Sequence, residues 1–315
     1  MITDLVIHRG RVIALFLCAL AGSSLMLTCS DANDPTSGRA LVVGSESAWR
    51  AMDDAAREFM AMYGKTSVRV MGGGSVAGLQ TMFDAQPSKD TIVAVSTRPL
   101  AEAEREAAIR KGFDPKEYRI AMDGIAIIVN KANPVESLTL AQVRDVFSGR
   151  IVNWRQLGGR NVPVKVIFGN PRSASYQLLR DSVLGDAGLA RSTQTTDSMK
   201  DIIHAVQRDT TAIGYCGSSY LYQEWLAQPQ IPEPGIKALG LARKTGDEYV
   251  VPDPGTIYDK SYPLWRYVYL IARREPKGIV SGFITFAMSS KGQQIFVQDG
   301  LAPVTVKFTV KREGE

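Results

Sequence analysis

The chain has 315 residues, which is enough to bury a sizeable core without metal or disulfide support and excludes the small disulfide-rich scaffolds. Hydrophobic residues make up 45% and charged residues 22%, so the disordered and collagen-like classes are excluded as well. Lysine and arginine number 37 against 32 aspartates and glutamates, but the basic residues are scattered along the sequence. This distribution argues against nucleic acid as a partner and favours a small anion.

The first 28 residues predict an export signal. Arg9 and Arg11 precede an apolar run at residues 12–21, and small residues follow, which is the order of a secretory signal peptide. The apolar run is about half of the ~20 residues that cross a bilayer, so a transmembrane helix is the weaker interpretation. We therefore expect residues 1–28 to be removed from the mature protein.

Cys29 ends the signal, and a polar, turn-rich stretch follows it. This pattern resembles a bacterial lipoprotein signal, in which the cysteine becomes the lipidated first residue. We expect Cys29 to carry the lipid anchor and residues 29–38 to form a tether to the membrane. Simple cleavage and release into the periplasm is the alternative.

The two other cysteines and the two histidines indicate neither a metal site nor a redox pair. Cys18 and Cys216 are far apart, and His8 and His204 have no evident partners in the sequence. We expect no metal, no cofactor and no catalytic residue.

From residue 39 onward, short β-branched runs alternate with helical patterns. This order predicts a largely parallel sheet flanked by helices. Proline-rich connectors are expected at residues 228–234 and 251–255. The expected strands are residues 41–43, 68–71, 92–95, 124–130, 164–168, 212–215 and 264–272, and the expected helices include residues 76–85, 101–111, 173–183, 278–288, 291–298 and one that Asp197 caps.

Small polar residues lie where several of these strands lead into helices. Ligands of open α/β sheets gather at the carboxyl ends of strands, and the first turn of a helix offers unpaired amides and a partial positive charge. Such loops suit a tetrahedral anion, which neutral donors hold reversibly. In any single loop, a serine that only caps its helix and a glycine that only makes a turn are the more common situation. The candidates are Ser45, Ser47, Gly74, Ser75, Thr97, Ser173 and Ser175.

The chain resembles the periplasmic solute-binding proteins of phosphate ABC transporters (the PstS-like family). The matching stretches follow one another in the family's order over nearly the whole mature chain. They are residues 43–47, 72–78, 96–100, 138–154, 212–215, 262–264 and 283–304.

This resemblance implies a type II fold with two α/β domains, joined by two crossing segments and closing on a ligand between them. The domains would be residues 39–125 together with 223–315, and residues 126–222. It also implies capture of inorganic phosphate or a related oxyanion, delivery to an ABC permease, a location in the periplasm or at the cell surface, and no enzymatic activity. Nothing in the sequence argues against a monomer.

The sequence departs from the family at two positions. The family's aspartate, which accepts a hydrogen bond from protonated phosphate and repels sulfate, falls at Thr97, and its usual arginine falls near Gly169. A hydroxyl is a weaker filter against sulfate than a carboxylate. Arg98 and Arg172 are expected to restore the missing positive charge. In the alternative, Arg98 pairs with Glu102 and Arg172 is an ordinary surface residue.

A second functional hypothesis is an enzyme or an oxyanion sensor built on the same fold. An enzyme would need a nucleophile with an orienting base, or clustered carboxylates. His204 is the one histidine left after removal of the signal, and it has no evident partner.

Overall fold

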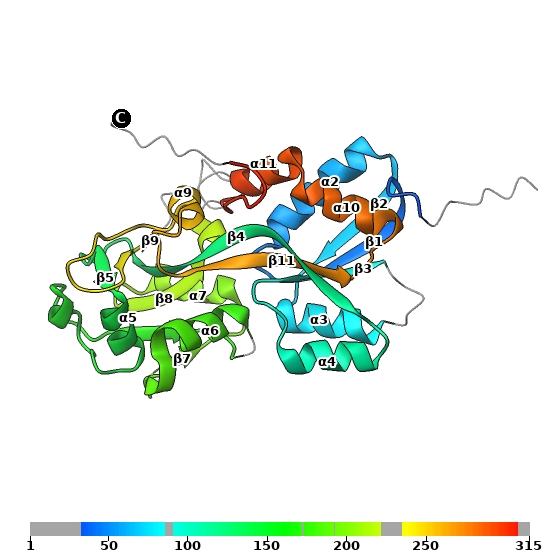
Figure 1. Ribbon diagram of the computed structural model, residues 1–315. Helices are drawn as coiled ribbons and strands as arrows, with labels where there is room; N and C mark the ends of the chain where they lie inside the picture. The colour runs from blue at the N-terminus through cyan, green and yellow to red at the C-terminus, as the bar shows by residue number, and fades with distance from the viewer. Residues whose placement is uncertain (1–32, 86–90, 172, 192, 222–234, 308–315) are drawn as a thin grey trace, which may run out of the picture. The chain divides into compact units, whose positions relative to one another are not determined.

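The computed structural model describes residues 33–85, 91–171, 173–191, 193–221 and 235–307 (Figure 1). The predicted signal peptide, Cys29, Arg172 and the connector at residues 228–234 lie outside the described residues. The first strand begins at Ser37, within the stretch that the sequence suggested as a tether.

One mixed sheet of nine strands organises the described part of the chain. The strands at each end of the sheet run parallel to their neighbours, whereas the central strands β11, β4 and β8 are antiparallel. The short strand β9 (Ile236–Ala238) also pairs with β4, and β5 (Ser137–Thr139) forms a separate pair with β10 (Gly240–Ala242). Across the sheet the order is β2 (Lys65–Met71), β1 (Ser37–Gly44), β3 (Ile92–Ser96), β11 (Trp265–Arg273), β4 (Pro115–Asn130), β8 (Ala212–Gly217), β6 (Lys165–Phe168) and β7 (Gln194–Thr195).

Helices follow most of these strands, as the alternating pattern predicts. Thr139 caps α5 by accepting a hydrogen bond from the amide of Gln142, in the capping-box arrangement. The helices are α2 (Trp49–Met62), α3 (Ser75–Asp84), α4 (Glu102–Arg110), α5 (Leu140–Phe147), α6 (Ala174–Leu179), α7 (Met199–Arg208), α9 (Pro254–Tyr258), α10 (Gly278–Met288) and α11 (Ser290–Gln298).

Apolar side chains form two large cores at opposite ends of the sheet. The first core gathers side chains of α2, α10, α11 and the strands beside them, and a small cluster under α3 adjoins this end of the sheet. The second core gathers side chains of α5, α6, α7, β6 and β8, and it also includes Ile257, Tyr262 and Leu264. We call the parts built on these cores the first and the second lobe. The long strands β4 and β11 run between the two lobes (Figure 1).

The structure differs from the sequence-based expectations at three places. The sheet is parallel only toward its two ends, because β4 and β11 cross between the lobes as an antiparallel pair. Ser198, not Asp197, caps α7, by accepting a hydrogen bond from the amide of Asp201. The expected helix at residues 173–183 ends as an α-helix at Leu179 and continues as a π-helical turn over Arg180–Leu184.

Pro254 begins the short helix α9, inside the stretch read from the sequence as a connector. Among the described residues, no helix is both long enough and apolar enough to cross a membrane.

Gly78 holds α3 close against β1, which fixes the loop where the candidate residues of the first lobe lie. A Cβ at this position would lie 2.5 Å from the Cα of Gly44 and 2.7 Å from the carbonyl oxygen of Val43. Both contacts are to backbone, so the helix itself would have to move away from the strand.

We expect Gly78→Ala to lower the free energy of unfolding by about 1–3 kcal/mol, because this overpacking cannot be relieved by a side chain. Gly64→Ala is the control, since no described heavy atom lies within 4 Å of its Cβ position. That change should be neutral or stabilising by up to ~1 kcal/mol. Urea unfolding of both variants is the measurement, and equal stabilities would contradict the close packing.

Candidate functional site

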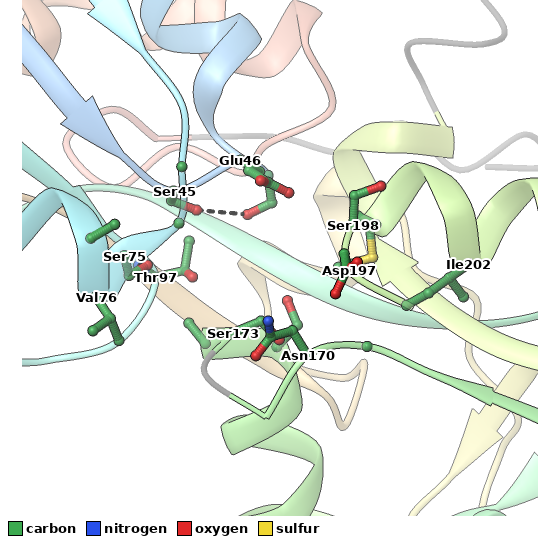
Figure 2. A pocket seen from close by; sticks show the side chains of 18 of the residues that line it. Ser45, Glu46, Ser75, Val76, Thr97, Asn170, Ser173, Asp197, Ser198 and Ile202 are labelled. Carbon is green, nitrogen blue, oxygen red and sulfur yellow. Dashed lines mark hydrogen bonds between the residues drawn. The ribbon is translucent and has the colours of Figure 1, made fainter. Parts of the chain in front are cut away.

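Most of the serines and turn residues singled out in the sequence line one pocket of about 280 Å³. Residues from both lobes contribute to it. Figure 2 shows Ser75 and Thr97 of the first lobe on one side of the hollow, with Asp197 and Ser198 of the second lobe across from them. The predicted residues that line it are Ser45, Ser47, Gly74, Ser75, Thr97, Ser173 and Ser175.

The hydroxyl groups in this pocket are held in place by hydrogen bonds within the protein. Ser75 Oγ accepts a hydrogen bond of 3.2 Å from the amide of Thr97, and Ser173 Oγ accepts one of 3.1 Å from the amide of Tyr176. Ser45 Oγ and Ser47 Oγ lie 3.2 Å apart. A hydroxyl that accepts a bond from the protein can donate its own proton to an anion. The structure therefore presents oriented, uncharged donors.

The backbone amides divide into those bound within the protein and those at helix starts. The amide of Ser45 donates to Val95, and the amide of Gly74 donates to Gly44, so these two amides hold the loops together. In contrast, Ser75 opens α3, and the amides of a first helical turn have no acceptor within their own helix. Gly74 has a φ of 88°, a conformation that favours glycine at the turn into this helix.

Tyr215 supports the second lobe's side of the pocket. Its hydroxyl accepts a hydrogen bond of 3.1 Å from the amide of Gly169. Burial raises the pKa of Tyr215 to about 12, the hydrogen bond from Gly169 opposing the shift. The phenol is therefore neutral at physiological pH and able to donate.

Arg266 and Asp123, neither of them expected from the sequence, form a buried ion pair behind the pocket. Arg266 Nη2 lies 2.8 Å and Nε 3.1 Å from Asp123 Oδ2, and the side chains are only 4% and 0% exposed. Arg266 Nη2 also donates to Ser47 Oγ, and Nη1 donates to Ser175 Oγ, both at 3.1 Å. One guanidinium thus bonds a serine of each lobe.

The carboxylate of this pair is held from its other side as well. Ser218 Oγ donates to Asp123 Oδ1 at 3.2 Å and accepts from the amide of Gly124 at 3.0 Å. Arg266 lies on β11 and Asp123 on β4, so the pair joins the two strands that run between the lobes. The one signal in the sequence was a charged residue within each of two apolar, strand-like stretches.

Arg98 does not line this pocket. Its guanidinium donates to both carboxylate oxygens of Glu104, at 2.7 and 2.6 Å. The suggested pairing with Glu102 is therefore wrong, because α4 presents Glu104 to this loop instead. Hydrogen bonding from Arg98 lowers the pKa of Glu104 against the raising effect of burial. Arg172, the other arginine proposed from the sequence, lies outside the described residues.

The charges that line the described part of the pocket are negative. Glu46 and Asp197 are both exposed and line it, whereas no described lysine or arginine does. Arg266 reaches it only through Ser47 and Ser175, and Asp123 neutralises its charge. Within the described ranges, no three histidine, cysteine or carboxylate side chains are grouped so as to hold a metal ion. The arrangement can bind and orient an anion through neutral donors.

Removal of one partner of the buried pair should be far more damaging than removal of both. We expect Arg266→Met to lower the free energy of unfolding by roughly 3–5 kcal/mol, because it leaves the Asp123 carboxylate buried and unpaired. The double variant Arg266→Met/Asp123→Leu should regain most of that loss. Urea unfolding is the measurement, and a double variant no more stable than the single one would contradict this account.

The exposed pair of Arg274 and Asp114 is a matched control for that experiment. These side chains are 57% and 49% exposed, and Arg274 Nη2 lies 3.0 Å from Asp114 Oδ1. Arg274→Met should therefore leave the free energy of unfolding nearly unchanged.

Comparisons with known proteins agree with this architecture. PstS, the phosphate-binding protein of Pseudomonas aeruginosa, is 24% identical over 292 residues, covering 87% of this chain and 86% of that protein. The crystal structure of a substrate-binding protein from Clostridium perfringens with bound phosphate has a TM-score of 0.71 and 27% identity, and the match covers 85% of this chain and 100% of that one. An ABC-type phosphate transport receptor from Vibrio cholerae, at 24% identity, has the same fold with a TM-score of 0.62, over 84% of this chain and 99% of that one.

The family model of the PBP superfamily domain matches residues 30–291, which is most of the sequence. The chain therefore belongs to the PBP superfamily, with its two-lobed type II periplasmic-binding-protein fold.

Proposed function

We propose that this protein captures inorganic phosphate, or a closely related tetrahedral oxyanion, and delivers it to an ABC permease. The observation that carries the proposal is the pocket itself. It gathers serine hydroxyls from both lobes in front of one guanidinium, Arg266, that hydrogen-bonds Ser47 and Ser175. An anion between these groups would be bonded by both lobes at once.

The uncharged donors of the pocket favour a receptor that binds its anion reversibly over a protein that holds it permanently. Hydroxyls and amides are uncharged, so they hold an anion without the cost of burying several unpaired cations. Among the described residues, Arg266 bonds two of the pocket's serines, and its charge is offset by Asp123. Binding by such groups is readily reversed, as release to a permease requires.

The known relatives support phosphate as the ligand. The Pseudomonas aeruginosa relative is a phosphate-binding protein, and the Clostridium perfringens structure contains phosphate. We propose that Ser45, Ser47, Ser75, Ser173 and Ser175 donate hydroxyl hydrogens to the anion. First-turn amides of α3 and α6 would complete the shell.

Ligand capture would proceed by closure of the lobes about β4 and β11. We propose a division in which residues 236–264 move with the second lobe, since Ile236, Leu241, Ile257 and Tyr262 pack in the second core. The first lobe would then combine residues before β4 with those after the start of β11. This division places the boundary differently from residues 39–125 with 223–315, which the resemblance implied.

The setting proposed for this receptor is outside the cytoplasmic membrane. Export through the signal at residues 1–28, lipidation at Cys29 and a monomeric state remain proposals that rest on the sequence. The proposed role includes no chemical conversion of the ligand, so the purified protein should leave phosphate esters intact.

The serines of the pocket should control binding, and other capping serines should not. Isothermal titration calorimetry should show phosphate binding to the mature protein, weakened about 10- to 100-fold in Ser75→Ala, because each lost bond to a charged ligand is worth roughly 1.5–3 kcal/mol. Ser289→Ala is the control. Ser289 caps α11 by accepting from the amide of Gly292, away from the pocket, and its loss should leave phosphate binding unchanged. If the wild-type protein shows no phosphate binding in this titration, even at high phosphate concentration, the proposal is refuted.

Thr97 should set how well the protein rejects sulfate. Its side chain is buried and lines the pocket, where a carboxylate would accept a hydrogen bond from protonated phosphate but repel sulfate. We expect Thr97→Asp to raise the ratio of phosphate to sulfate affinity by at least about tenfold, measured by competitive titration at neutral pH. Thr97→Asn introduces a side chain of the same shape as aspartate but without its charge, and it should leave the ratio of phosphate to sulfate affinity nearly unaltered. A similar rise in both variants would show that charge at residue 97 is not the filter.

A further inference from the structure

A second hollow of about 620 Å³ adjoins the anion pocket. Thr97 of the first lobe and Ala174 of the second lobe line both hollows, so the two meet between these residues. Arg266 also lines the second hollow while it hydrogen-bonds Ser47 and Ser175 of the first. A ligand seated among the serines could therefore extend past Thr97 and Ala174 without leaving the protein.

The wall of the second hollow is largely aromatic and apolar. Trp265, Tyr267 and Tyr269 follow one another at alternate positions of β11 and line it. Their rings stack edge to face, with centroids 5.3 Å apart for Trp265 and Tyr267 and 6.1 Å apart for Tyr267 and Tyr269. Leu100 from the first lobe and Leu178 from the second complete the apolar lining. Such a surface binds apolar or aromatic groups.

Each arginine of this hollow lies beside a carboxylate that offsets its charge, which argues against a second anion as the occupant. Arg98 bonds both oxygens of Glu104, and Arg180 Nε lies 2.7 Å from Asp181 Oδ1. Arg266 is paired with Asp123. The combined space of the two hollows lies within the range of ~300–1,000 Å³ that is typical of small organic ligands. Inorganic phosphate bound among the serines would leave the second hollow unfilled.

We propose that the second hollow is a subsite for the organic group of a phosphate monoester or phosphonate whose phosphoryl group lies among the serines. This inference rests on the proposed function, because the headgroup must bind in the first pocket. The aromatic side chains of β11 would contact an apolar or aromatic substituent, while the serines that Arg266 bonds contact the headgroup. The protein would then accept organic phosphoryl compounds in addition to the inorganic anion.

A pair of ligands with the same headgroup tests the subsite. Titration calorimetry of the mature wild-type protein with phenylphosphonate and methylphosphonate should show the phenyl compound binding at least about tenfold more tightly, because only its ring reaches the aromatic wall. Inorganic phosphate, measured in the same buffer, reports on the first pocket alone. Phosphate binding with no preference for the phenyl compound would overturn the subsite and leave the proposed function intact. No binding of any of the three anions would overturn both.

A filling substitution tests where the substituent lies. Gln177 lines the second hollow but not the first, so Gln177→Trp should weaken phenylphosphonate binding at least about tenfold and leave phosphate within about twofold. Gln177→Ala opens the same position and should preserve both affinities. Ala101→Trp fills the hollow from the opposite lobe and provides an independent variant. Unchanged phenylphosphonate affinity in both folded tryptophan variants, checked by thermal unfolding, would overturn the proposal.

Discussion

The buried pair of Arg266 and Asp123 is the interaction on which the site depends. Each group alone would be a costly unpaired charge in the interior, so the position of one fixes the position of the other. The pair spans β11 and β4, and its guanidinium bonds Ser47 in one lobe and Ser175 in the other. The need to pair these two buried charges therefore fixes how the two strands cross between the lobes. It also orients Ser47 and Ser175, the two candidate ligand groups that Arg266 bonds.

Because the ion pair is neutral overall, the described part of the pocket offers an anion no unpaired positive charge. With the charge of Arg266 offset, the described lining contains hydroxyls and amides, together with the exposed carboxylates of Glu46 and Asp197. A protein that must release its ligand gains from this balance, since several unpaired cations would bind a divalent anion too firmly. Affinity then depends on the number and alignment of hydrogen bonds, which closure of two lobes can assemble or disperse.

The loops of the site could be predicted because strands and helices alternate along the chain. The buried ion pair could not, because its two residues are far apart in the sequence. Ser45, Ser75 and Ser173 could be recognised because each follows a strand and precedes a helix, and such loops meet at one edge of a sheet. Asp123 and Arg266 are 143 residues apart, and neither lies in a loop or a motif. The parallel pattern was misread at the centre for the same reason, because antiparallel pairing of β4 and β11 depends on partners distant in sequence. Arg98 was assigned to the site to supply positive charge, and its partner Glu104 lies outside the i, i+4 spacing that suggested Glu102.

Strand β11 serves two purposes through the alternation of its side chains. Arg266 shares its face with Val268 and Leu270, which are buried in the first core, so a charged residue continues an otherwise apolar row at the point where the strand passes between the lobes. Trp265 and Tyr267 occupy the other face and line the second hollow. A single strand thereby places the group that organises the headgroup site beside the rings proposed to contact a substituent. In the proposed arrangement the serines would contact the headgroup and the rings would contact the substituent, so either contact could change by substitution without loss of the other.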